Sequence, residues 1–179
     1  MRSVLLLAVL FALWGIVGAV EDSFTITVTV EWLDISLRTA DDAGDYTNWD
    51  LGTVPAGTVD SMTTGSGGNH ILVKNNCNVT VDFSAYSTTT VPSCSYGTPT
   101  AWTPGTSPGL DTYLLEGGKG DLSTYPTSWT TIDATSAPGN VYASGETPGN
   151  DHRFYAKFST PTSVSDGCQH TITVYIVAQ

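Results

Sequence analysis

Apolar side chains that recur at every second position, between turns rich in glycine and proline, constrain this chain more than any other feature. The first such stretch is "SFTITVTVEW", residues 23–32, and its alternating apolar side chains are Phe24, Ile26, Val28, Val30 and Trp32. A period of two is typical of a β-strand with one buried face. After the N-terminal leader, no ten-residue window keeps an apolar period of 3.6 without Gly or Pro. The pattern therefore predicts an all-β protein.

Further strand-like segments follow at short intervals along the chain. Together with the first, the predicted strands are 24–32, 33–38, 50–54, 70–75, 78–85, 110–116, 128–133, 140–143, 152–159 and 169–178. Turn clusters such as "VPAGT", "TTGSGGN" and "TPGTSPG" separate them. About 8–10 short strands joined in this way predict a single β-sandwich of jelly-roll or Ig-like type.

The first residues, "MRSVLLLAVLFALWGIVGAV", have the composition of a secretory leader. One Arg precedes an apolar run, and Val17 and Ala19 supply small residues at the −3 and −1 positions of a cleavage site. The run is short for a membrane span, which needs about 20 residues. We therefore expect a signal peptide over 1–19, cleaved after Ala19, and a single exported domain over 20–179 with no membrane insertion. The alternative is an uncleaved N-terminal anchor.

The charge balance excludes some classes of partner. The chain carries 17 acidic and 6 basic residues, for a formal net charge of −11. Binding to nucleic acid or to an anionic membrane needs Lys and Arg, so neither partner is expected. Phosphate loops, dinucleotide fingerprints and haem-attachment motifs are absent from the sequence, and Ser66 does not stand in a GxSxG motif. These patterns predict no cofactor and no enzymatic activity.

The cysteines are an odd set for an oxidising compartment: Cys77, Cys94 and Cys168. One disulfide and one remaining thiol is the simplest arrangement. We favour a Cys77–Cys94 bond, which closes a short loop, and the alternative is a Cys77–Cys168 bond between two strands. No CxxC pair is present, so the spacing fits no zinc site.

An acidic loop, "DDAGDYTNWD", is a candidate for calcium. Its carboxylates are Asp41, Asp42, Asp45 and Asp50. Calcium takes six to eight oxygen ligands, and this loop could supply several. It lacks the register of an EF-hand, and a solvated turn is the simpler interpretation, so we expect no metal.

Two kinds of surface site are compatible with an exported β-protein. Asn78 begins the sequon "NVT", and a hairpin corner would expose it for N-glycosylation. Trp102 and Trp129 lie in segments flanked by loops, where exposed rings could stack against sugars. The alternative is that both rings anchor loops to the core, because each buries a large area.

The order of several segments resembles a known group of proteins. A threonine-rich strand after the leader is followed by "NWDLGTVPAG", "ILVKNNCNVTVDFSA" and a final "HTITVYIVAQ". This layout resembles the TasA/camelysin-like matrix proteins and the bundling pilins and threads of archaea, which are secreted β-sandwich subunits of extracellular fibres. The resemblance implies a jelly-roll-like sandwich whose N-terminal strand completes the sheet of a neighbour.

The leading functional hypothesis is therefore a structural one. We expect a secreted subunit of an extracellular filament, pilus or surface layer, a homo-polymer in which residues 23–32 pair with the next subunit. The competing interpretation of that strand is that it folds back beside 169–178 as an edge of its own sandwich. The alternative function is a monomeric carbohydrate- or cell-wall-binding module that uses Trp102 and Trp129.

Overall fold

The computed structural model describes residues 25–28, 30–94 and 97–179. Residues Glu31–Gln179 form one compact unit, and the residues up to Val30 belong to another. The described residues contain strands and no helix. In chain order the strands are β1 (Ile35–Arg38), β2 (Val59–Ser61), β3 (Ile71–Asn75), β4 (Val81–Thr89), β5 (Thr103–Pro104), β6 (Thr112–Gly120), β7 (Thr130–Thr131), β8 (Asn140–Glu146), β9 (His152–Ser159) and β10 (Ile172–Ala178).

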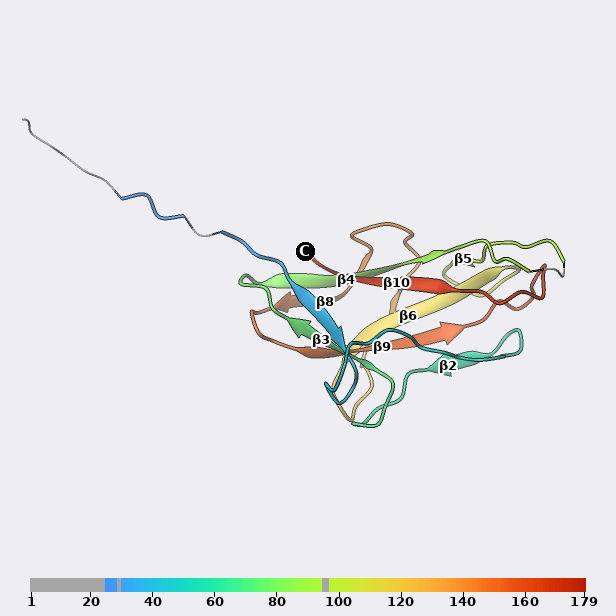
Figure 1. Ribbon diagram of the computed structural model, residues 1–179, viewed down its shortest axis with the longest axis horizontal. Helices are drawn as coiled ribbons and strands as arrows, with labels where there is room; N and C mark the ends of the chain where they lie inside the picture. Colours follow the sequence, from blue (N-terminus) through green and yellow to red (C-terminus); the bar gives the residue numbers. More distant parts are fainter. Residues whose placement is uncertain (1–24, 29, 95–96) are drawn as a thin grey trace, which may run out of the picture. The chain divides into compact units, whose positions relative to one another are not determined.

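These strands form two sheets. The larger has the order β1-β3-β9-β6-β5, with β2 also paired to β9 and β7 to β6, and the smaller has the order β10-β4-β8. All pairs are antiparallel except β5 with β6. In Figure 1, β4 and β10 lie in one layer, and β3, β6 and β9 lie in the other. The predicted all-β sandwich is confirmed.

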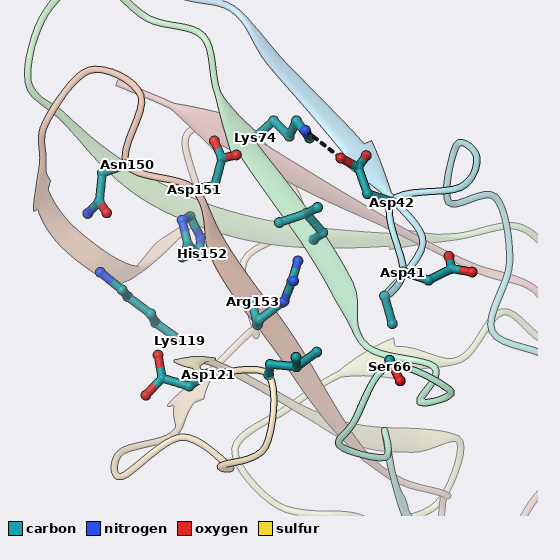
Figure 2. Close-up of a pocket in the computed structure, with 14 residues that line it drawn as sticks. Asp41, Asp42, Ser66, Lys74, Lys119, Asp121, Asn150, Asp151, His152 and Arg153 are labelled. Carbon is teal, nitrogen blue, oxygen red and sulfur yellow. Dashed lines mark ion pairs between the residues drawn. The ribbon is translucent and has the colours of Figure 1, made fainter.

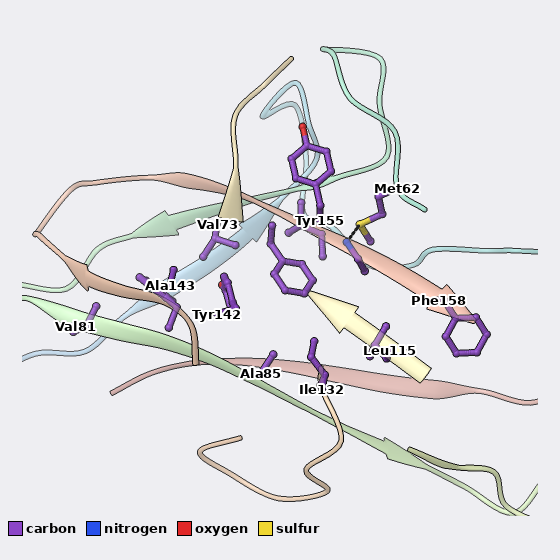
Figure 3. Close-up of a cluster of buried hydrophobic side chains, with 14 of the residues drawn as sticks. Met62, Val73, Val81, Ala85, Leu115, Ile132, Tyr142, Ala143, Tyr155 and Phe158 are labelled. Atoms are coloured by element: carbon purple, nitrogen blue, oxygen red, sulfur yellow. Dashed lines mark hydrogen bonds between the residues drawn. The ribbon is translucent and has the colours of Figure 1, made fainter. Parts of the chain in front are cut away.

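The core lies between the two layers and follows from the period of two in the sequence. In β4, Val81, Phe83 and Ala85 point inward and are buried. In β9, Phe154 and Phe158 do the same from the opposite sheet. Leu115 of β6 and Ile132, which follows β7, belong to the same buried cluster as these side chains, part of which Figure 3 shows. Each strand thus buries alternate residues, as β-strands with one apolar face must.

Two of the predicted strands do not form. Residues 50–54 have no strand, because Gly52 takes a left-handed φ of 62° and Leu51 packs against the core from an irregular segment. In the predicted strand 24–32, the described residues 25–28 and 30–32 form no strand either. An extended segment needs a partner edge to become a strand.

Part of the outer face of the larger sheet is covered by the chain itself. Gly118 and Gly120 of β6 lie directly under the connection that leads to β7. A Cβ atom on Gly118 would lie 2.6 Å from the Ser128 carbonyl oxygen, and one on Gly120 would lie 2.7 Å from that of Thr124. On the outer face of the smaller sheet, the rings of Tyr86 and Tyr175 stack against each other, and Tyr175 is 42% exposed.

On the inner face of β6, Gly117 makes room for the core. A Cβ atom there would lie 2.6 Å from Phe154 and 2.8 Å from Ile132. We expect Gly117→Ala to lower the free energy of unfolding by about 1–3 kcal/mol, because overpacking displaces buried side chains. Urea unfolding measures this change. Gly67→Ala is the control, because nothing lies within 4 Å of its Cβ position, and an equal loss in both variants would contradict the packing argument.

Candidate assembly site

The N-terminal apolar segment is exposed over its described length. Ile26, Val28 and Val30 are 73%, 75% and 74% exposed, and Trp32 is 65% exposed. Phe24, the first of the predicted donor residues, lies outside the described residues. A contiguous run of exposed large apolar side chains is unusual on a soluble monomer and marks an interaction surface.

Trp32 is fixed to the turn between β3 and β4. Its backbone N–H donates to Asn78 Oδ1 at 2.7 Å, and the Asn78 N–H donates to the Trp32 carbonyl at 3.1 Å. A further hydrogen bond joins the same two segments: the Asn76 N–H donates to the Asp34 carbonyl at 3.0 Å. The end of the apolar segment is therefore held in place while the Trp32 ring stays exposed. Asn78 is also exposed, and its glycosylation stays a prediction.

The edge strand of the smaller sheet has an apolar face that is incompletely covered. Within the described residues, β10 pairs with β4 on one side and with no strand on the other. Its inward side chains pack against the core and yet remain half-buried; they are Ile172, Val174, Ile176 and Ala178. Three of the four residues opposite them in central β4, Phe83, Ala85 and Ser87, are buried. An unpaired edge of this kind can accept another strand.

The favoured disulfide, Cys77–Cys94, is wrong, and so is the alternative Cys77–Cys168. Cys94 bonds to Cys168 across a Cα separation of 5.7 Å, and Cys77 is a buried thiol. The register of β4 with β10 explains the pairing, because Thr89 is opposite Ile172 and the two cysteines lie just beyond these residues. Cys77 instead packs in the core after β3.

The carboxylates of the acidic loop are engaged within the protein. Asp42 pairs with Lys74 at 2.6 Å and with Arg38 at 2.9 Å, and these two cations lower its pKa. Asp45 also pairs with Arg38, at 2.6 Å. Asp41 accepts a hydrogen bond from the Thr39 hydroxyl, which lowers the pKa of Asp41. Asp50 lies apart from them and accepts the N–H of Gly52. In the described ranges, no three acidic, His or Cys side chains are grouped as metal ligands.

The two tryptophans considered as sugar platforms both contact the domain. The Trp102 ring stacks on His170, with ring centroids 4.0 Å apart. Lys157 Nζ lies over the Trp129 ring, 5.1 Å from its centroid. Both rings also pack against the core. These contacts favour the anchoring interpretation over an open stacking surface.

A polar cleft of about 690 Å³ also lies on the larger sheet, and no sequence pattern indicates it. Leu72, Arg153 and Gly120 are neighbours across β3, β9 and β6 and line its floor. Arg153 Nη1 is buried and has no hydrogen-bond partner in the described part of the chain. Figure 2 shows Lys119 and Asn150 toward one end of the cleft and Ser66 toward the other. Acidic and basic side chains both line the cleft, so its charge favours neither anionic nor cationic ligands.

Among the described residues, no helix has the length and apolar character needed to cross a membrane. Comparison of the chain with protein-family models, with curated proteins and with solved structures finds no match.

Proposed function

We propose that this protein is a secreted structural subunit that polymerises by strand donation, without enzymatic activity, into an extracellular filament or surface layer. The N-terminal segment 23–32 of one copy adds to a sheet edge of the next. The observation that carries the proposal is the exposed apolar side chain at every second position of the described segment. The disulfide is compatible with an exported protein.

Burial of the segment supplies enough free energy for assembly. Each large apolar side chain that moves from water into a protein interior contributes about 1.5–3 kcal/mol. Association costs several kcal/mol in lost freedom of motion, so several such residues together can hold two subunits. The threonines between them favour extended backbone and carry no charge that would repel a partner edge.

The free edge of β10 is the acceptor that best fits this segment. A strand added there completes the ladder of the smaller sheet, and its apolar side chains cover the half-buried inward residues of β10. One subunit then offers both a donor segment and an acceptor edge. Repetition of such a head-to-tail contact does not close, so it produces a fibre.

The proposal is tested by one charge placed on either face of the segment. We expect Val28→Asp to abolish filaments, because the carboxylate would be buried without a partner. Thr27→Asp is the matched control: it introduces the same charge one residue away, on the face directed to solvent. Negative-stain electron microscopy and sedimentation velocity of the mature full-length proteins measure the outcome.

Two results would contradict the proposal. Wild-type protein that stays monomeric at all concentrations excludes polymerisation. Equal filament formation by the Val28→Asp and Thr27→Asp variants excludes the apolar face as the contact, even if the protein polymerises by another surface.

A further inference from the structure

Three side chains from separate segments meet at one end of the polar cleft. Glu146, the last residue of β8, accepts a hydrogen bond from Lys119 Nζ on Oε1 at 2.5 Å. Its other oxygen, Oε2, accepts one from Asn150 Nδ2, also at 2.5 Å. The carboxylate is buried, with Glu146 only 4% exposed. An amine and a primary amide are thus held against the two oxygens of one buried carboxylate, and Figure 2 shows both of them at the cleft.

The turn that carries Asn150 is held in place by a buried residue of β3. Asn75 is 1% exposed, and its side-chain Nδ2 donates to the Thr147 carbonyl at 2.9 Å. Its backbone carbonyl accepts a hydrogen bond from the Gly149 N–H at 3.0 Å. The Asn75 N–H donates to Asp151 Oδ1 at 3.0 Å. These bonds fix the turn on both sides of Asn150, so the amide is positioned by the fold.

The other two lysines lack this arrangement. Lys74 pairs with Asp42 and Lys157 pairs with Glu116, at 2.6 and 2.7 Å. In the described part of the chain, neither of these carboxylates accepts a hydrogen bond from an Asn or Gln side chain. Both are also more exposed than Glu146, with side chains 41% and 19% exposed against 5%. The combination of amine, buried carboxylate and amide is therefore particular to Lys119.

We propose that Lys119 and Asn150 join in an intramolecular isopeptide bond whose formation Glu146 promotes. A proton moves from the Lys119 ammonium, whose side chain is 38% exposed, to the buried Glu146 carboxylate, which removes the charge of that carboxylate. The neutral Nζ then attacks Cγ of Asn150, and a C–N bond forms. Glu146 passes the proton to Nδ2, the Cγ–Nδ2 bond breaks, and ammonia leaves. Nζ gives up its second proton to the Glu146 carboxylate, which releases it to solvent, so that the products are a secondary amide and ammonia. No oxidant or other reactant is needed.

The physical basis is proximity together with acid–base catalysis. An amide is a poor electrophile and ammonia a poor leaving group, so the uncatalysed reaction is slow. Fixed geometry replaces a bimolecular encounter with a unimolecular step. One carboxylate that contacts both nitrogens can accept a proton from one and donate it to the other. This bond links β6 to the β8–β9 turn, and it does not depend on polymerisation.

The test is peptide mapping of the reduced wild-type protein with trypsin. Trypsin cleaves after Lys74 and Arg153, and it also cleaves after Lys119 unless that side chain is modified. The proposal predicts an intact 75–153 peptide whose mass is lower than its sequence requires by one ammonia, about 17 Da. Fragment spectra should show residues 119 and 150 joined.

Variants assign the roles of the residues. Glu146→Gln and Lys119→Arg are expected to restore the full mass, and in the Glu146→Gln variant trypsin should cleave after Lys119; far-UV circular dichroism verifies that each variant is folded. Lys157→Arg is the matched control and should keep the bond.

Three outcomes overturn the inference. Wild-type protein of full mass, cleaved after Lys119, shows that no bond forms. Loss of ammonia together with cleavage after Lys119 shows that an asparagine has cyclised on its own backbone and that Lys119 is not joined to it. A bond that persists in folded Glu146→Gln excludes the role of the carboxylate.

Discussion

A Cys94→Ser, Cys168→Ser double variant is expected to unfold with a free energy about 4 kcal/mol lower than that of the wild-type protein. The disulfide joins residues 74 positions apart. In the chain-entropy model, a crosslink restricts the unfolded chain more as the loop it closes becomes longer. The loops beside it contain little regular structure, so they depend on this link more than the strands do.

The local network explains why the variant should still fold. Asp166 accepts the Thr100 N–H at 2.8 Å and the Cys168 N–H at 3.1 Å, and it contacts His170 Nε2 at 2.9 Å. These bonds keep the two loops together without the disulfide. Urea unfolding measures the loss. Cys77→Ala is the control, because it removes a buried sulfur and leaves the disulfide intact; a double variant no less stable than this control would contradict the prediction.

Acidification from pH 7 to below pH 4 is expected to cost the fold about 3 kcal/mol through His152 alone. Burial lowers the pKa of His152 to about 4, from an ordinary value of 6.5. The ring lies edge-on to Phe83, and its Nε2 is 3.0 Å from the Tyr142 hydroxyl. The charges of Glu146 and Asp151 act in the opposite direction and favour protonation, while that of Lys119 disfavours it.

The direction of this effect follows from the two pKa values. The unfolded chain binds a proton at His152 below about pH 6.5, and the folded chain does so only below about pH 4. The stability that neutral His152 contributes to the fold is therefore fully present above pH 6.5. It decreases as the pH falls and is lost below pH 4. Carboxylates with lowered pKa values, such as Asp42 and Asp166, contribute in the same direction at lower pH, below their ordinary value of 3.8.

The measurement is the free energy of unfolding at several pH values between 7 and 4. His152→Gln removes the titrating group and keeps a polar atom for Tyr142, so its stability should change far less over this interval. An NMR titration of the wild-type His152 ring gives the pKa directly. A midpoint near 6.5, or equal pH dependence in both proteins, would contradict the prediction.

The parts of the fold that were predictable are those in which a local pattern decides the structure. The stretch "HRFYAKFS" forms β9 over the predicted residues 152–159, because its alternation places Phe154 and Phe158 in the core. By contrast, β2 and β5 were missed. They are short, and β2 reads "VDS" with no apolar alternation, so their partners in the sheet determine them.

The candidate sites depended more on tertiary structure. The alternation in 24–32 predicts an extended segment with one apolar face, but a period of two contains no information about which edge it pairs with. The Cys94–Cys168 bond required the register of β4 with β10. Lys119, Glu146 and Asn150 come from β6, β8 and a turn, and no spacing in the sequence indicates that they meet.

The glycines at the end of β6 influence how this surface can change during evolution. Because the connection to β7 lies against Gly118 and Gly120 at backbone distance, substitutions there are limited by space and not by the chemistry of the new side chain. That part of the larger sheet cannot acquire new recognition chemistry by point mutation. The outer face of the smaller sheet is covered in part, because the buried Ser84 hydroxyl donates to the Pro138 carbonyl, but Tyr175, which stacks on Tyr86, is 42% exposed. Natural variation can therefore alter exposed positions such as Tyr175, and the side chains that line the polar cleft, more readily than these two glycines.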